Sequence, residues 1–202
     1  MAWKGFDVIS IGVDLGKMRD HSAIAVVRRP ETFVRTATLH PWTVIDERRD
    51  GPAALIHMEK IPLGTPYVKV VERIRQVAQH PELGAGKRQV VVDATGVGMP
   101  VVDMLRAVRL GCELKPVTIT GGMGENYSRG IYSVGRSDLL SGLRSSLETK
   151  WMEIGKGQRI WPELRKQLIG FGGCGADDLV LAFALAAWGA RAGERYEGAP
   201  AG

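Results

Sequence analysis

Aspartates stand at three places where the chain could assemble a carboxylate site. Asp14 ends the apolar stretch DVISIGVD, Asp93 ends a second one, QVVVD, and Asp177 and Asp178 open a third, DDLVLAFALAAW. Carboxylates gathered in a low-dielectric site repel one another unless a cation neutralises them, and their oxygens suit Mg²⁺ or Mn²⁺. Two such ions ~3.5 to 4 Å apart can activate a water and stabilise the leaving oxygen in phosphodiester hydrolysis. The pattern therefore predicts a two-metal hydrolytic site.

Each acid also has a purely structural interpretation. An aspartate that ends a strand just before a glycine often forms a turn, which applies to Asp14 and Asp93. Asp177 and Asp178 suit the first positions of a helix, where a carboxylate complements the helix dipole. The joint occurrence of the acids favours the metal site, but the sequence does not separate Asp177 from Asp178.

The elements that would position these acids follow the order strand, strand, strand, helix, strand, helix, strand. Helical spacing after Pro66 and Pro100 predicts the two helices. The order predicts an α/β fold with a mixed five-stranded sheet, three antiparallel strands followed by two parallel ones, flanked by helices. Asp14 and Asp93 would then lie side by side at one edge. The predicted strands cover residues 7–16, 22–29, 36–45, 89–93 and 115–120.

The second half of the chain adds smaller elements to this sheet. The glycine-rich stretch 121–135 predicts a mobile loop, and 151–161 predicts a small β-hairpin before the last helix. Ser137 is expected to cap a leucine-striped helix, and Pro162 to start a short one. The helix from 177 to about 192 is apolar on nearly all sides and should be buried. We expect a single domain over 1–192 and a flexible tail over 193–202.

Composition and cysteine usage exclude several classes of protein. The 202 residues include 45% apolar and 24% charged side chains, ordinary values for a globular chain. We expect no membrane partner and a cytoplasmic location, because the sequence has neither eighteen consecutive apolar residues nor a signal-peptide pattern. Cys112 and Cys174 lack CxxC spacing, which argues against a zinc site or a disulfide framework. The net charge of +5 is compatible with an anionic partner.

Basic residues concentrate in the segment 127–170, where they outnumber acids by eight to four. Phosphate neutralisation dominates non-specific DNA affinity, so this segment is a candidate track for a duplex, although a solvated helix face would have the same composition. Two further basic residues follow the first acid closely. The candidate DNA-binding residues are Lys17, Arg19, Arg129, Arg136, Arg144, Lys150, Lys156 and Arg159.

Taken together, the motifs resemble the nuclease domain of the phage terminase large subunit over about residues 7–190. The resemblance rests on GVDLG with Asp20 and Ser22, on VVVDATGVG and on GADDLVLAFALAAW, with VGRSDLL and LRKQLIGF between the last two. It implies a ribonuclease H-like fold and an endonuclease that cuts concatemeric double-stranded phage DNA during genome packaging. The implied location is the cytoplasm of an infected bacterial host.

The same resemblance implies ligands and partners. Two Mg²⁺ or Mn²⁺ ions would be held by Asp14, Asp93 and either Asp177 or Asp178. Asp20 would be an alternate metal ligand or would support the ligands from behind. We expect Asp14 to contact both ions because its strand is central. The implied partners are double-stranded DNA, a terminase small subunit, a packaging ATPase and the portal.

Two departures from the family pattern stand out. Ala176 occupies the place where the family often has a histidine before the paired acids, which removes one possible ligand or proton shuttle. The chain also has no GxxxxGK[ST] phosphate loop, since GAGKR at 84–88 lacks the leading glycine and the final Ser or Thr. The packaging ATPase would therefore be a separate chain or another domain of a longer protein.

Three other classes of protein share parts of this pattern. A Holliday-junction resolvase or another ribonuclease H-like nuclease would use the same acids on a different substrate. An actin-type or hexokinase-type ATPase has a hairpin similar to IGVDLG, but it needs two lobes to hold its nucleotide. In a non-catalytic DNA-packaging scaffold, the acids would only cap helices and form turns.

Overall fold

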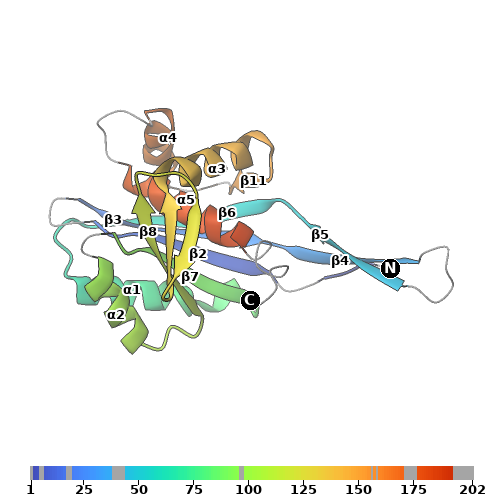
Figure 1. Cartoon of the computed structure of the whole chain (residues 1–202), viewed down its shortest axis with the longest axis horizontal. Helices are drawn as coiled ribbons and strands as arrows, with labels where there is room; N and C mark the ends of the chain where they lie inside the picture. Colours follow the sequence, from blue (N-terminus) through green and yellow to red (C-terminus); the bar gives the residue numbers. More distant parts are fainter. Residues whose placement is uncertain are drawn as a thin grey trace.

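The computed structural model describes residues 2–4, 7–16, 20–37, 44–95, 98–155, 157, 159–170 and 177–192. Within them, the main feature is an eight-stranded sheet with the strand order β11-β6-β3-β2-β7-β8-β10-β9 (Figure 1). Its strands are β2 (Val8–Asp14), β3 (Ser22–Arg29), β6 (Ala53–Ile61), β7 (Lys87–Asp93), β8 (Glu113–Thr120), β9 (Glu125–Ser128), β10 (Ile131–Gly135) and β11 (Met152–Ile154). The helices are α1 (Tyr67–Ala78), α2 (Gly98–Ala107), α3 (Arg136–Glu148), α4 (Trp161–Ile169) and α5 (Asp178–Ala192), with a short 3₁₀ turn at Pro81–Leu83.

The five central strands, β6, β3, β2, β7 and β8, have the relative directions that the sequence predicts. β3 runs antiparallel to β2 and to β6, whereas β7 runs parallel to β2 and β8 runs parallel to β7. Helices cover both faces of this sheet (Figure 1). The predicted fold class, a mixed sheet with three antiparallel strands followed by two parallel ones, is confirmed.

The predicted strand at 36–45 is wrong as the third strand of this sheet. β4 (Glu31–Ala37) and β5 (Val44–Asp50) instead pair in a separate antiparallel sheet with β1 (Ala2–Lys4), and residues 38–43 lie outside the described part of the chain. β4 and β5 extend away from the main sheet as a long ribbon (Figure 1).

The true third strand, β6, escaped prediction because it contains an irregularity. Val26 and Val27 of β3 pair with His57 and Leu55, so Ile56 is an extra residue in β6. Such a β-bulge interrupts the alternation of apolar and polar residues by which strands are recognised in a sequence.

Three details of the second half also differ from the expectation. The stretch 121–135 forms the antiparallel hairpin β9–β10 rather than a loop, and β10 extends the sheet parallel to β8. In place of the hairpin predicted at 151–161, the described residues contain the short strand β11, which pairs parallel with β6. Ser137 does not cap α3, because Gly135 is the N-cap residue. The predicted helices are present, and the tail 193–202 lies outside the described residues.

Alternate residues of the central strands belong to two separate hydrophobic cores. Ile9, Ile11 and Val13 of β2 pack with residues of α1 and α2 on one face of the sheet. The intervening positions, Ser10 and Gly12, face α5, which lies with α3 and α4 on the opposite side (Figure 1). The alternation of large and small residues in β2 thus marks the face that a helix approaches closely.

Helix α5 contacts the backbone of β2 because neither element has a bulky side chain at the crossing. A Cβ atom on Gly12 would lie 2.1 Å from the carbonyl oxygen of Ala182 and 2.3 Å from the nitrogen of Ala186. On the helix, a Cβ atom on Gly189 would lie 2.3 Å from Ser10 Oγ. Despite its apolar composition, neither α5 nor any other helix in the described part of the chain is long enough to cross a lipid bilayer.

Gly12→Ala should destabilise the protein by about 3 kcal/mol, the upper part of the range for overpacked cores, because the added methyl meets helix backbone rather than a movable side chain. Urea unfolding followed by circular dichroism measures the loss. Gly142→Ala in α3 is the matched control, since its Cβ would meet nothing closer than 4.0 Å. That control should be neutral or stabilising by roughly 0.5–1 kcal/mol. Equal stability of the two variants would contradict the proposed close contact.

Candidate active site

Two of the candidate acids lie on the face of the sheet that α5 covers. Asp14 follows Gly12 by two residues and therefore shares its face, and Asp93 ends β7 in the same way. The parallel register pairs Val13 with Val92, so the next two positions are Asp14 and Asp93. Both carboxylates thus stand at the carboxyl ends of neighbouring strands, as expected from the sequence.

The amino-terminal end of α5 brings the paired acids to the same place. Asp178 is the first residue of the helix, and Asp177 precedes it. Asp14, Asp20, Asp93, Asp177 and Asp178 all line one depression of about 380 Å³. The structure therefore gathers all five predicted metal-binding residues around a single cavity.

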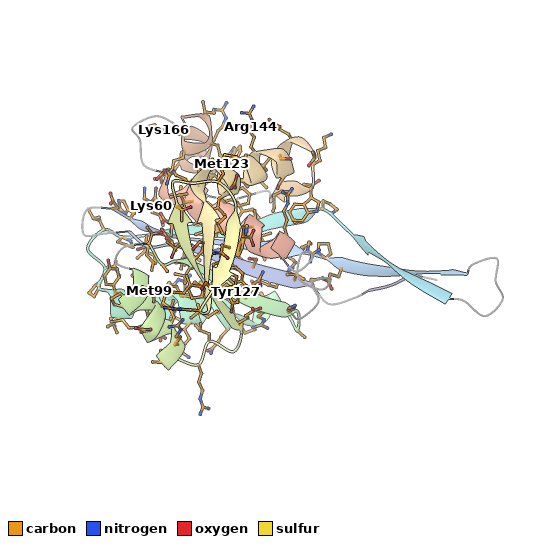
Figure 2. All side chains as sticks on the ribbon, viewed as in Figure 1. Lys60, Met99, Met123, Tyr127, Arg144 and Lys166 are labelled. Carbon is orange, nitrogen blue, oxygen red and sulfur yellow. The ribbon has the colours of Figure 1, made fainter. Side chains whose placement is uncertain are left out.

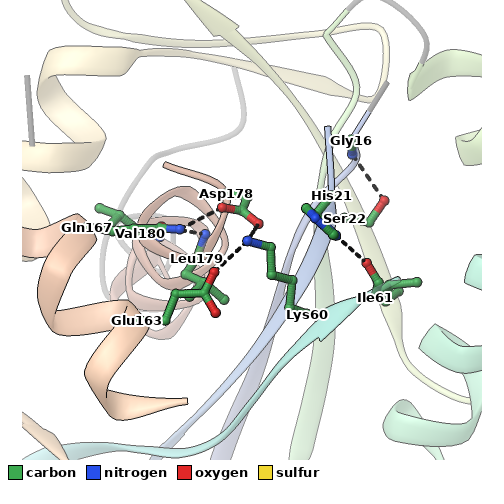
Figure 3. Close-up of polar contacts among 10 residues, drawn as sticks. All are labelled: Gly16, His21, Ser22, Lys60, Ile61, Glu163, Gln167, Asp178, Leu179 and Val180. Atoms are coloured by element: carbon green, nitrogen blue, oxygen red, sulfur yellow. Dashed lines mark hydrogen bonds and ion pairs between the residues drawn. The ribbon is translucent and has the colours of Figure 1, made fainter. Parts of the chain in front are cut away.

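The described residues on either side of Asp20 contact the neighbouring strands. Ser22 Oγ accepts a hydrogen bond from the backbone nitrogen of Gly16 at 3.1 Å, and His21 Nδ1 lies 3.1 Å from the carbonyl oxygen of Ile61 (Figure 3). Asp20 itself is exposed and lines the cavity.

Asp93 also has the turn-forming role considered from the sequence. Its Oδ1 accepts a hydrogen bond from the backbone nitrogen of Thr95 at 2.8 Å. Thr95 Oγ1 in turn accepts one from the nitrogen of Ile119 in β8. One carboxylate oxygen of Asp93 is therefore used to shape the loop, which orients the side chain at the cavity.

Asp14 is buried at the cavity among other carboxylates. Burial raises the pKa of Asp14 well above its usual range, and the carboxylates of Asp93, Asp177 and Asp178 raise it further, whereas Arg136 acts in the opposite direction. A buried acid beside three others is unfavourable as an anion unless positive charge is supplied.

Two cations of the chain supply part of that charge. Arg136, the first residue of α3, donates a hydrogen bond from Nη2 to Asp177 Oδ2. Lys60 Nζ lies 2.5 Å from Glu163 Oε1 and 3.3 Å from Asp178 Oδ2 (Figure 3). Burial alone would lower the pKa of Lys60, but Glu163 and Asp178 together raise it, so the lysine remains charged.

The donor set has the chemistry that Mg²⁺ and Mn²⁺ require, because every candidate ligand is a carboxylate oxygen. Within the described residues, however, no three acidic, histidine or cysteine side chains already stand close enough to enclose an ion. The ion pairs with Arg136 and Lys60 hold Asp177 and Asp178 in their present positions. The donors therefore fit such ions in type, and closure around a metal would need side-chain rotation.

Among the candidate DNA-binding residues, the structure places Arg136 at the cavity. Arg144 lies further along α3, where Glu148 accepts a hydrogen bond from it at 2.7 Å. Its side chain points outward on the same side of the protein as Lys166 (Figure 2).

The other candidate DNA-binding residues lie elsewhere. Lys150 follows the far end of α3, and Arg129 lies in the β9–β10 turn, at the opposite end of β10 from Arg136. Arg159 is exposed just before α4, while Lys17, Arg19 and Lys156 lie outside the described residues.

Sequence reasoning missed two residues of the site, Lys60 and Gln167. Lys60 is near the end of β6, the strand whose bulge concealed it. Gln167 is buried in α4 and contacts the start of α5, a relation between two helices that no local pattern reveals. The motif LRKQLIGF contains this glutamine, but its composition gives no indication of the contact.

Comparisons with known proteins give distant structural likenesses. No protein-family model matches the chain, and no curated protein does. Thermus thermophilus RuvC is similar at 14% identity over 94% of this chain and 96% of that one, with a TM-score of 0.41. T. thermophilus RuvC in complex with a Holliday junction substrate is similar at 15% identity over 95% and 96%, with a TM-score of 0.42.

Asp14→Asn should raise the melting temperature at pH 7 in EDTA, because it removes a buried carboxyl group whose ionisation is unfavourable in the folded protein. The raised pKa means that the folded protein holds this proton more tightly than the unfolded chain, so the cost appears only above the unfolded value of about 3.9 and increases until the pH passes the raised pKa of the folded protein. We expect a gain of roughly 2–4 °C for each kcal/mol removed, shrinking as the pH falls towards 4. Thermal unfolding by circular dichroism measures it, with the exposed Asp103→Asn as control. A difference in melting temperature that does not change with pH would contradict the raised pKa of Asp14.

Proposed function

We propose that this protein is a metal-dependent endonuclease that hydrolyses phosphodiester bonds of double-stranded DNA. The observation that carries the proposal is the meeting of Asp14, Asp93, Asp177 and Asp178 at one cavity, with Asp14 buried among the other three. Such a concentration of negative charge opposes folding, and bound divalent cations would neutralise it.

The chain's own residues would divide the work as follows. Asp14, Asp93 and one of the paired acids would hold the metal, whose chemistry there is to activate water and to neutralise charge on the leaving oxygen. Asp93 is kept in place by its hydrogen bond from Thr95. Arg136, half-exposed at the cavity, is in a position to contact a phosphate of the substrate once it releases Asp177.

The biological setting that we propose is phage genome packaging, with concatemeric DNA as substrate. The support is the resemblance of the motifs around Asp14, Asp93 and Asp178 to the terminase large-subunit nuclease. A terminase small subunit, a packaging ATPase and the portal would then be the partners. Sequence choice would come from those partners, because phosphate contacts carry no base information.

Purified protein should nick and linearise supercoiled plasmid with Mg²⁺ or Mn²⁺ and leave it intact in EDTA. Asp14→Asn and Asp93→Ala should each abolish cutting while the circular dichroism spectrum remains unchanged, because both remove a ligand without altering the sheet. Asp103→Asn, an exposed acid on α2, should cut like the wild type.

The pattern of cleavage separates the alternatives. If Asp93→Ala still cuts DNA with Mn²⁺, this cavity is not the active site. Cutting of a four-way junction but not of linear duplex would identify a junction resolvase instead. Absence of metal binding together with absence of cutting would favour a DNA-binding scaffold.

A further inference from the structure

Asp178 differs from Asp177 in how tightly its carboxylate is held. The side chain of Asp178 is 8% exposed, whereas that of Asp177 is 35% exposed. Gln167 Nε2 donates a hydrogen bond to Asp178 Oδ1 at 2.7 Å, and the Lys60 ammonium lies 3.3 Å from Asp178 Oδ2 (Figure 3). One oxygen of Asp178 therefore accepts a hydrogen bond from α4, whereas the other accepts none from the described part of the chain and faces the ammonium group of a β6 residue.

The amide of Gln167 has only one possible orientation. Gln167 Oε1 accepts hydrogen bonds from the backbone nitrogens of Leu179 at 3.0 Å and Val180 at 3.3 Å (Figure 3). Only the oxygen can accept from a backbone N–H, so the NH₂ group must face Asp178. The same side chain thus caps the free N–H groups at the start of α5 and sets the direction of the Asp178 carboxylate.

These contacts join α4 to the carboxylate cluster. Gln167 is itself buried, and Leu164 on the same helix is completely buried in the core that contains Leu179. Glu163, one turn before Gln167, holds Lys60 from the other side. A shift of α4 would therefore move both partners of Asp178 at once.

We infer that Gln167 is a positioning residue that holds Asp178 as the metal ligand of the acid pair, in preference to Asp177. The inference rests on the proposed function and deepens it, because it names which acid completes the site and what orients it. Residues that hold a ligand through its second oxygen commonly change metal affinity or activity 10–100-fold when removed.

The test is a double-mutant cycle read by Mn²⁺ binding in calorimetry, without DNA. Gln167→Met keeps the size of the side chain but loses every hydrogen bond, and it should weaken Mn²⁺ binding by about 10–100-fold. In the Asp178→Asn background the same change should have no further effect, whereas in the Asp177→Asn background it should keep its full effect. Gln76→Met, the same substitution on the exposed face of α1, is the matched control and should leave binding unchanged.

A purely structural role gives a different result. Loss of the helix cap alone would lower the urea midpoint of Gln167→Met in every background and leave Mn²⁺ affinity within twofold, which would overturn the inference. Weaker Mn²⁺ binding by Asp177→Asn than by Asp178→Asn would overturn the inference as well. The nuclease proposal would still stand in that case if Asp14→Asn abolished cutting. If the wild type binds no Mn²⁺, the proposed function fails, and this inference fails with it.

Discussion

Mutual repulsion among carboxylates is the constraint that the rest of this fold must resist. Asp14 and Asp93 are held by the ladder between two parallel strands, whose register leaves them no freedom to separate. Asp178 is held by a buried helix that contacts the β2 backbone at Gly12. Since the strands and the helix pack directly against each other, the charges cannot move apart without disturbing the core between them.

The chain partly balances this charge with cations from elements that lie far away in sequence. Arg136 comes from the start of α3 and Lys60 from β6, and each pairs with one of the two adjacent acids where α5 begins. A divalent ion entering the cavity would compete with these side chains rather than fill an empty space. Lys60 keeps a second partner in Glu163, so it can yield one carboxylate and remain paired.

The sequence predicted the parts of the site that depend on local pattern. Asp14 and Asp93 were placed correctly because a buried strand and the acid that ends it are contiguous. The sequence did not predict β6, because a bulge at Ile56 interrupts the alternation of apolar and polar residues. Without that strand, Lys60 could not be recognised as a residue of the site. Gln167 could not be found at all, because its role exists only when two helices meet. The contacts that the sequence alone did not predict are those between residues far apart in the chain.

The contact at Gly12 also limits which residues this position can accept during evolution. A larger residue at that position is compatible with the fold only if the helix backbone near Ala182 and Ala186 moves away. Such a movement would carry Asp178 with it, because that acid begins the same helix. Gly12 thus affects the position of Asp178 although the two residues are far apart in sequence. Related chains should have a larger residue at this position only where the start of the helix also differs.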